Sequence, residues 1–138
     1  MRAEWLILAD AAQVVGGKLY LMGGGWDLLT VSQAFPVSQR CAIAASFAIA
    51  WTETNQKHNV EIVIVSDDGA ELGKIQAQME VGRPLGAQPG SDQRAQLAAE
   101  MNLELRAPGS FAIIASIEGR EEMRTAFRVV AGAGVQQA

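Results

Sequence analysis

The stretch from Cys41 to Trp51 constrains the fold of this chain more than any other. Large residues occupy its odd positions and small residues its even positions, with Ala45 as the one small residue in the odd set. The odd set is Cys41, Ile43, Ala45, Phe47, Ile49 and Trp51, and the even set is Ala42, Ala44, Ser46, Ala48 and Ala50. Because successive side chains of a strand point to opposite faces, this period of two predicts a long β-strand despite the alanine content.

The small-residue face of that strand has two candidate neighbours. Small side chains let another layer approach closely, so an exposed strip would be an interface for another subunit. A layer from the same chain would cover it equally well. The candidate interface strip consists of Ala42, Ala44, Ser46, Ala48 and Ala50. The substitution Ala44→Arg separates the two possibilities, since a dimer that becomes a folded monomer indicates a subunit and misfolding indicates an internal layer.

Period-two segments and extended runs recur along the rest of the chain. The segment 97–106 also contains helix formers, but five alternations in a row favour a strand there. Gly16-Gly17 and Asp68-Gly69 are typical of tight hairpin turns, the second of type I′. The sequence therefore predicts an all-β fold, an antiparallel two-sheet β-sandwich of about eight or nine strands, immunoglobulin-like in general shape. The expected strands cover 5–10, 18–22, 26–31, 41–51, 60–65, 72–81, 97–106, 111–118 and 123–130.

Length and charge limit the class of protein. The 138 residues predict one sandwich domain over 1–131, with 132–138 as a flexible C-terminal tail. The net charge of −4 and a pI near 4.9 argue against nucleic-acid binding, which requires clustered lysine and arginine. The apolar run near Trp5 is short and bracketed by Glu4 and Asp10, so we expect a cytoplasmic protein that does not contact a membrane.

No set of residues has the spacing of a catalytic or metal site. The single cysteine, Cys41, excludes an internal disulfide and is expected to be a small buried hydrophobe. The triple glycine 23–25 leads into an extended run without a lysine, which does not suit a phosphate cradle. His58, the one histidine, is expected to be a solvated loop residue, and Asp67-Asp68 suits a turn better than a calcium site. We therefore expect no catalytic residues, metal ligands or cofactor, and a protein that is not an enzyme.

The turn at Trp26-Asp27 is the least ordinary place in the sequence. A tryptophan beside glycines on an exposed turn can stack on a ligand or anchor a partner. The structural alternative is that Trp26 closes one end of the sandwich. Arg83 lies in the irregular segment 82–94, and Trp5 lies in the apolar first strand. The candidate ligand or partner contacts are Trp26, Asp27, Arg83 and Trp5.

Two functions are compatible with these features. The first is a non-catalytic binding or assembly module that acts through protein–protein contacts, as a homo-oligomer or an accessory subunit of a larger complex. The absent catalytic set and the apolar first strand favour it. The alternative is a small-molecule or carbohydrate-binding domain that uses the glycine-rich Trp26-Asp27 turn and the loop 82–94.

The N-terminal region also carries a resemblance. Its parts are Leu8-Ala9-Asp10-Ala11-Ala12 and the run from Gly17-Lys18-Leu19-Tyr20 to Gly23-Gly24-Gly25-Trp26-Asp27. This opening resembles that of a family of small uncharacterised bacterial and phage-encoded β-sandwich proteins. The resemblance covers about a fifth of the chain, and it implies a fold and no activity.

Overall fold

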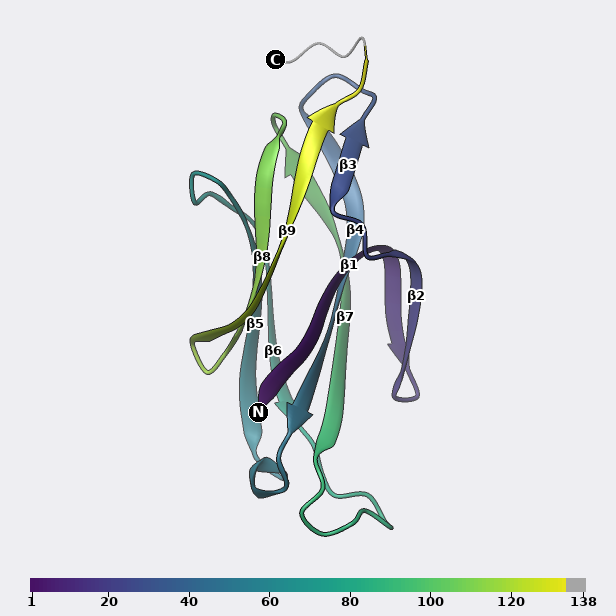
Figure 1. Ribbon diagram of the computed structural model, residues 1–138, viewed down its shortest axis with the longest axis vertical. Helices are drawn as coiled ribbons and strands as arrows, with labels where there is room; N and C mark the ends of the chain where they lie inside the picture. Colours follow the sequence, from purple (N-terminus) through teal and green to yellow (C-terminus); the bar gives the residue numbers. More distant parts are fainter. Residues whose placement is uncertain (134–138) are drawn as a thin grey trace.

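The computed structural model describes residues 1–133 and shows two β-sheets packed face to face (Figure 1). One sheet has the strand order β2-β1-β4-β7 and the other has the order β3-β9-β8-β5-β6. Neighbouring strands are antiparallel except β3 and β9, which are parallel. The predicted sandwich is therefore confirmed, with nine strands. They are β1 (Arg2–Val15), β2 (Lys18–Gly24), β3 (Leu28–Val31), β4 (Val37–Ile49), β5 (Lys57–Ser66), β6 (Glu71–Glu80), β7 (Gln93–Leu105), β8 (Gly109–Ile117) and β9 (Arg120–Ala131).

The strand order explains the immunoglobulin-like shape. Strands β1, β4 and β7 face β9, β8, β5 and β6, which is the arrangement of strands A, B and E against G, F, C and C′ in an immunoglobulin sandwich. Strands β2 and β3 have no counterpart in that arrangement, and in sequence they lie between β1 and β4. The one helical element of residues 1–133 is a 3₁₀ turn, η1 (Trp51–Glu53). None of the described residues form a helix that is long and apolar enough to cross a membrane.

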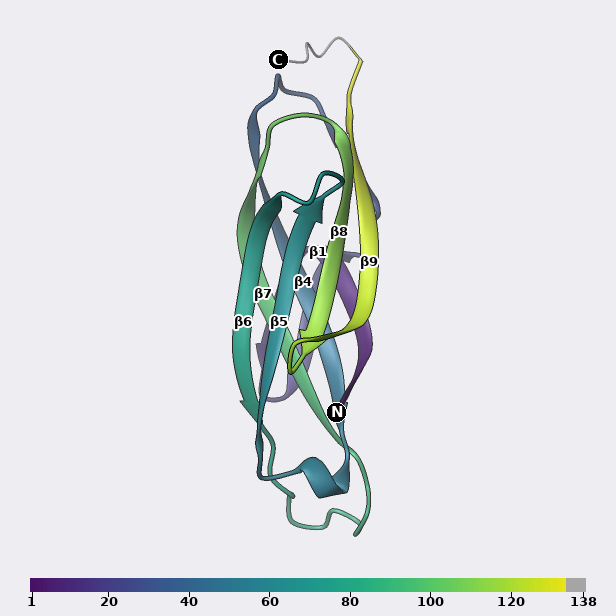
Figure 2. The ribbon, with the colours of Figure 1, turned by 90° about the vertical axis from the view of Figure 1, so that its left-hand side faces the viewer.

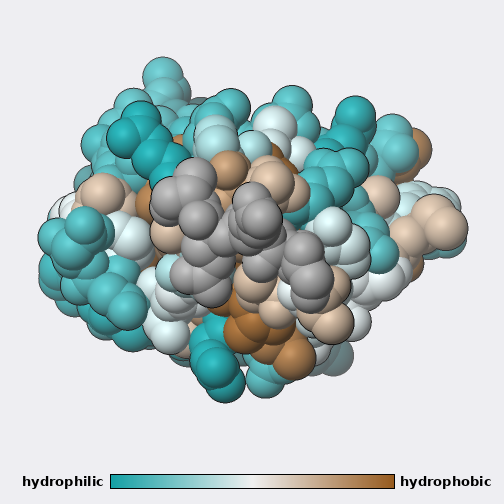
Figure 3. Space-filling view, turned by 90° about the horizontal axis from the view of Figure 1, so that it is seen from above, coloured by the Kyte–Doolittle hydropathy of each residue, from teal (hydrophilic) through white to brown (hydrophobic). Residues whose placement is uncertain are grey.

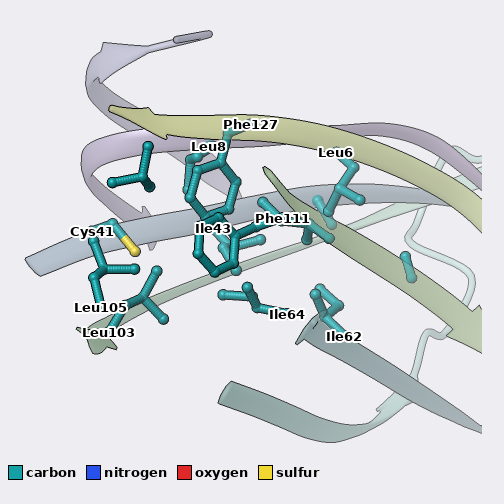
Figure 4. Packing of buried hydrophobic residues seen from close by; sticks show 14 of the residues in the cluster. Leu6, Leu8, Cys41, Ile43, Ile62, Ile64, Leu103, Leu105, Phe111 and Phe127 are labelled. Carbon is teal, nitrogen blue, oxygen red and sulfur yellow. The ribbon is translucent and has the colours of Figure 1, made fainter. Parts of the chain in front are cut away.

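The core lies between the two sheets and is built on the inner face of β4. The odd side chains of β4 from Cys41 to Ile49 are almost completely buried. Those from Cys41 to Phe47 belong to one buried cluster with Phe111 and Phe127 of the opposite sheet, and Figure 4 shows Ile43 beside these two rings. These two rings are stacked, with centroids 5.2 Å apart. Each large apolar side chain buried here contributes roughly 1.5–3 kcal/mol to folding, so this layer provides most of the driving force.

The C-terminal end of β4 differs from the prediction. The strand ends at Ile49, and Trp51 lies in η1 rather than on the apolar face of the strand. The carbonyl of Trp51 accepts hydrogen bonds from the Thr54 hydroxyl at 2.7 Å and from Arg83 at 2.8 Å. These bonds hold a turn that the period of two does not reveal.

The even face of β4 is buried as well, and the same chain covers part of it. Strand β1 pairs with β4 only as far as Ala9 and then continues, paired with β2, as a hairpin that leaves the sheet (Figure 1). Ala12 of this hairpin is buried against Ala42 and Ala44, and Leu19 packs on the same group. Ala42, Ala44 and Ser46 are 0% exposed, Ala48 is 3% exposed, and Ala50 is partly exposed. The candidate interface strip is thus a covered surface, and at Ala42 and Ala44 the cover is an internal layer.

Two turns show how glycines shape the hairpins. Gly16 and Gly17 both have positive φ, 60° and 75°, as the predicted two-residue turn between β1 and β2 requires. The hairpin at Ser66–Glu71 is also confirmed, but of its residues only Gly69 has a positive φ, so the turn is not type I′. Instead, the amide of Gly69 donates to the carbonyl of Ser66 at 3.0 Å, and Ser66 pairs with Ala70.

The glycine run 23–25 does not end β2 where the sequence suggested. The strand continues to Gly24. Gly23 has φ of 60°, and a Cβ there would lie 2.3 Å from the Asp10 carboxylate. The amide of Gly25 donates to the carbonyl of Leu8 at 2.8 Å, which draws the chain back across β1 towards β3. The glycines therefore let β2 lie against Asp10 and then turn.

Of the predicted tail 132–138, residues 134–138 lie outside the described part of the chain.

Candidate functional site: the outer surface of the β1–β2 hairpin

Exposed large apolar side chains gather on the β1–β2 hairpin. Six such side chains are exposed among residues 1–133, and four of them belong to this hairpin. The other two, Leu28 and Leu85, stand apart in β3 and in the loop after β6. We call the four the hairpin surface: Val15 (51% exposed), Tyr20 (57%), Leu21 (37%) and Met22 (73%). Single exposed apolar residues are ordinary, but a group on one element marks a contact site.

The register of the hairpin explains why Val15, Tyr20 and Met22 point outward, whereas the fourth side chain, Leu21, pairs with Ala12 on the opposite face and is exposed there. Tyr20 pairs with Gln13 and Met22 pairs with Ala11, so these four side chains share one face. The opposite face carries Ala12 and Leu19, which pack on the alanines of β4. Since one face holds the hairpin to the sheet, the other face is left to solvent.

Strand β2 is also an edge of its sheet, with β1 as its one neighbour. The main-chain groups on its outer side therefore have no partner strand among the described residues, as is usual for an edge. After Lys18, no proline or charged side chain occurs before Asp27. In Figures 1 and 3 the hairpin projects from the right-hand side of the molecule, and in Figure 3 the projection carries pale and light-brown surface.

The other three edges are protected in familiar ways. Strand β6, at the left in Figure 2, exposes polar side chains alone: Glu71, Lys74, Gln76, Gln78 and Glu80. Strand β7 contacts β6 at the corner of the sandwich and exposes Arg94, Glu100, Asn102 and Glu104. Strand β3 has only four residues. Charges and short length both discourage pairing with another chain, so β2 is the least protected edge.

Trp26 closes one side of the core rather than presenting a free ring. Its indole packs edge-on against Phe127, with centroids 6.0 Å apart and an angle of 82° between the rings. The side chain is partly buried, and its Nε1 is buried without a hydrogen-bond partner. Asp27 is exposed, and its carbonyl accepts a hydrogen bond from the Arg128 amide at 2.8 Å.

Arg83 is held by the chain itself. Its guanidinium lies 4.0 Å over the ring of Trp51, and its Nε donates to the Thr54 hydroxyl at 2.7 Å. The Asn55 amide donates to the carbonyl of Val81 beside it, at 2.8 Å. These contacts tie the start of the loop 82–92 to the β4–β5 connection at the lower end of the sandwich. The β2–β3 connection lies higher (Figure 1), so the structure does not bring Trp26 and Arg83 into one site.

Trp5 lies beside a polar group on the outer face of the four-stranded sheet. It pairs with Ser46 and packs, partly buried, on the alanine cluster under the hairpin. Next to it, the Glu4 carboxylate accepts hydrogen bonds from Arg94 at 2.7 Å and from the Ser46 hydroxyl at 2.7 Å. These bonds, chiefly the one from Arg94, lower the pKa of Glu4 to about 2. This arrangement satisfies Ser46, the polar residue in the small-residue strip.

Two further sequence predictions concern buried groups. Cys41 is buried as expected, and burial raises the pKa of its thiol to about 11. The prediction for His58 is wrong, because β5 begins at Lys57 and places the imidazole inside, 8% exposed. Its Nε2 lies 2.8 Å from the carbonyl of Glu53, so it joins the β4–β5 connection to the sheet.

A hollow of about 620 Å³ lies where the β5–β6 and β7–β8 turns meet, and its rim carries acidic side chains beside Arg106. Residues 1–133 contain no group of three or more side chains placed to hold a metal ion.

Sequence reasoning overlooked the hairpin surface. The available signal was the run of residues 19–22, which holds a tyrosine and a methionine and no charge.

The comparisons with known proteins bear on family and not on activity. No curated protein matches the chain. A family model described as a family of unknown function (DUF6941) matches residues 4–130. The match confirms the expected membership of an uncharacterised family, while a bacterial or phage origin stays an expectation. Because the matched region spans nearly the whole sandwich, the chain belongs to this family of unknown function, DUF6941.

Proposed function

We propose that this protein is a non-catalytic binding module that acts through protein–protein contacts, and that the hairpin surface makes them. The observation that supports this most is the coincidence of exposed apolar side chains with an unprotected sheet edge. Met22, at 73% exposed, lies on a strand whose outer main-chain groups have no partner strand in the described part of the chain. An edge of this kind accepts a strand from another chain, in which main-chain hydrogen bonds give affinity and alternate side chains give specificity.

The interior of the hairpin supports the same proposal. Ala12 and Leu19 pack the hairpin against the small-residue strip. The outward side chains therefore lie on a strand pair that is held in place, and not on a mobile loop. A preorganised surface loses less conformational entropy when it binds.

The cytoplasm remains our expected location, and the protein has no proposed cofactor.

The alternative, a small-molecule or carbohydrate-binding domain, has less support. The Trp26 ring is packed on Phe127 and the Arg83 guanidinium is stacked on Trp51, so both side chains already serve internal contacts. A ligand that bound at this turn would change the fluorescence of Trp26. A ligand screen in which the response of the native protein disappears in Trp26→Phe would favour the alternative.

Site-specific photo-crosslinking tests the proposed function in cells of the natural host. A photoreactive phenylalanine analogue at position 20 replaces an exposed tyrosine, and the same analogue at position 76 replaces an exposed glutamine of β6 as the matched control. We expect a cross-linked adduct of defined mass from position 20 and none from position 76. The absence of an adduct at position 20, or equal adducts at both positions, would contradict the proposal.

A further inference from the structure

We infer that the partner of strand β2 is the β2 strand of a second copy of this chain. The two strands pair antiparallel across a two-fold axis and join the two β1–β2 hairpins into one four-stranded layer. This inference rests on the proposed function, because it names the partner of the same hairpin surface. Three features of the hairpin lead to it: an edge open to pairing, a self-complementary row of side chains, and a self-complementary pair of charges.

The geometry of an edge strand favours a copy of itself. A two-fold axis places the same surface on both subunits, so that residue i meets j while j meets i. In an antiparallel pair the two strands run in opposite directions, which is the relation that such an axis perpendicular to the sheet produces. The regular part of β2 runs from Lys18 to Met22, before Gly23 departs to a positive φ. Its midpoint is Tyr20, so the axis passes beside Tyr20.

This register matches the side chains of the hairpin surface. Tyr20 of one copy lies opposite Tyr20 of the other, and Met22 lies opposite Lys18. All three side chains share the outward face, because each pairs across the hairpin with an outward residue of β1. Aromatic pairs directly across an antiparallel ladder are favourable, and the methylene stem of a lysine packs well on methionine.

The charges of the hairpin complement each other in the same arrangement. From Asp10 to Gly24 the chain has two charged side chains, Asp10 and Lys18, and both are exposed. Lys18 begins β2, whereas the Asp10 carboxylate lies against Gly23 near its end. Antiparallel pairing therefore sets the Lys18 end of one copy against the Asp10 end of the other, twice, with Lys18 on the outward face and Asp10 on the face of Ala12. Parallel pairing would place like charges together, and a partner chosen only for apolar contact would leave both charges without a counterpart.

The contact is small, which sets the expected affinity. One short strand and the side chains beside it form an interface at the low end of the size range for specific complexes. We therefore expect a dissociation constant of roughly 1–100 µM, and a dimer that forms and separates with protein concentration.

Light scattering and sedimentation of the purified chain test the inference. At concentrations above the dissociation constant, the weight-average mass should approach twice the chain mass of 14.7 kDa. Met22→Lys should shift the equilibrium at least tenfold towards the monomer, because it places two lysines opposite each other. The matched control Gln76→Lys, on the exposed side of β6, should leave the equilibrium unchanged. A far-ultraviolet spectrum of each variant shows whether the fold is intact.

A disulfide trap tests the register independently. In Tyr20→Cys the two new cysteines lie opposite each other, and directly opposed residues of antiparallel strands have Cα atoms about 4.5–5.5 Å apart, within reach of a disulfide. Mild oxidation should therefore link the chains rapidly. Gln76→Cys should not link them, and the buried Cys41 should not react in either variant.

The outcomes separate this inference from the proposed function. A monomer at all concentrations, or disulfides that form equally fast at positions 20 and 76, would overturn the pairing of two copies. If that result comes with a host adduct at position 20 whose mass shows a different protein, the proposed function stands and the second copy is excluded. If position 20 gives no adduct in the host either, both fail.

Discussion

The edge strands β2 and β6 end their sheets in opposite ways. Strand β6 exposes glutamate, lysine and glutamine on alternate positions, whereas β2 exposes Tyr20, Leu21 and Met22 after a single lysine. Both edges belong to the same sandwich, so topology does not account for the difference. The choice of side chains does, because charged edges resist pairing and apolar edges accept it. The comparison teaches that charged and polar side chains protect one edge of this fold, whereas the other edge lacks that protection.

The layers under the two edges differ as well. Strand β6 covers the main core with side chains such as Ile75 and Met79, which pack against it. The β1–β2 hairpin lies on a second, smaller cluster around Ala42 and Ala44. The open edge therefore depends on a few small residues for its position, and changes in that cluster should affect it first.

The substitution Ala44→Arg should have the largest effect. Ala44 is 0% exposed beneath the hairpin, so a long charged side chain there must either displace the hairpin or lose its hydration. We expect the free energy of unfolding, measured with urea, to fall by about 3 kcal/mol or more. The control Gln78→Arg, on the exposed side of β6, should change it by less than about 0.5 kcal/mol. A loss below 1 kcal/mol in Ala44→Arg would show that the hairpin does not rest on this cluster.

Gly23→Ala tests how the hairpin ends. Gly23 has φ of 60°, and an added Cβ would meet the Asp10 carboxylate. The positive φ alone should lower the free energy of unfolding by about 1–2 kcal/mol, since the carboxylate can move aside. In the control Gly109→Ala the new methyl group meets open space, and φ is not positive. Equal losses in the two variants would contradict the special geometry of Gly23.

Arg83→Lys tests the contrast between the anchored loop after β6 and the projecting hairpin. Lysine keeps the charge but not the planar group that stacks on Trp51 and bonds to Thr54. We expect a loss of about 1 kcal/mol in urea unfolding, together with a change in tryptophan fluorescence. Arg120→Lys, at an exposed ion pair, is the control and should be nearly neutral. An unchanged Arg83→Lys protein would mean that these contacts do not hold the loop.

The lowered pKa of Glu4 predicts that the free energy of unfolding depends slightly on pH. Its pKa is about 2 in the folded chain, below the ordinary value of 4.5, because Arg94 and Ser46 donate to it. A lowered pKa contributes stability that is present above pH 4.5 and is lost as pH falls towards 2. Arg94 is largely exposed, so solvent screening limits the contribution to about 1 kcal/mol. Glu4→Gln should remove this part of the decline in urea stability between pH 5 and pH 2, and Glu80→Gln on β6 is the control. An identical decline in both variants would contradict the assignment.

Periodicity was a good guide where one residue type alternates with another. It located β4, β6 and β7, and it placed Gln76 and Gln78 outside and Leu103 inside. It was less reliable where strands end. Nothing in the pattern near Trp51 shows that Thr54 and Arg83 bond to its carbonyl, and nothing near His58 shows that β5 has already begun.

The candidate site was the harder part to predict. Trp26 attracted attention because tryptophan often marks contacts, but its environment depends on Phe127, a hundred residues later in the chain. Tyr20 and Met22 became informative only when β2 proved to be an edge strand, and strand order is a property of the whole fold. The cover over Ala42 and Ala44 likewise depends on where the hairpin folds back.

Hydrogen exchange at two protein concentrations a hundredfold apart tests the central claim most directly. It compares the backbone amides of β2 (18–24) with those of β6 (71–80) in the same sample. If β2 pairs with a second copy, its outer amides should exchange at least threefold more slowly at the higher concentration, while those of β6 should not change. Exchange in β2 that is the same at both concentrations would contradict the pairing of this edge.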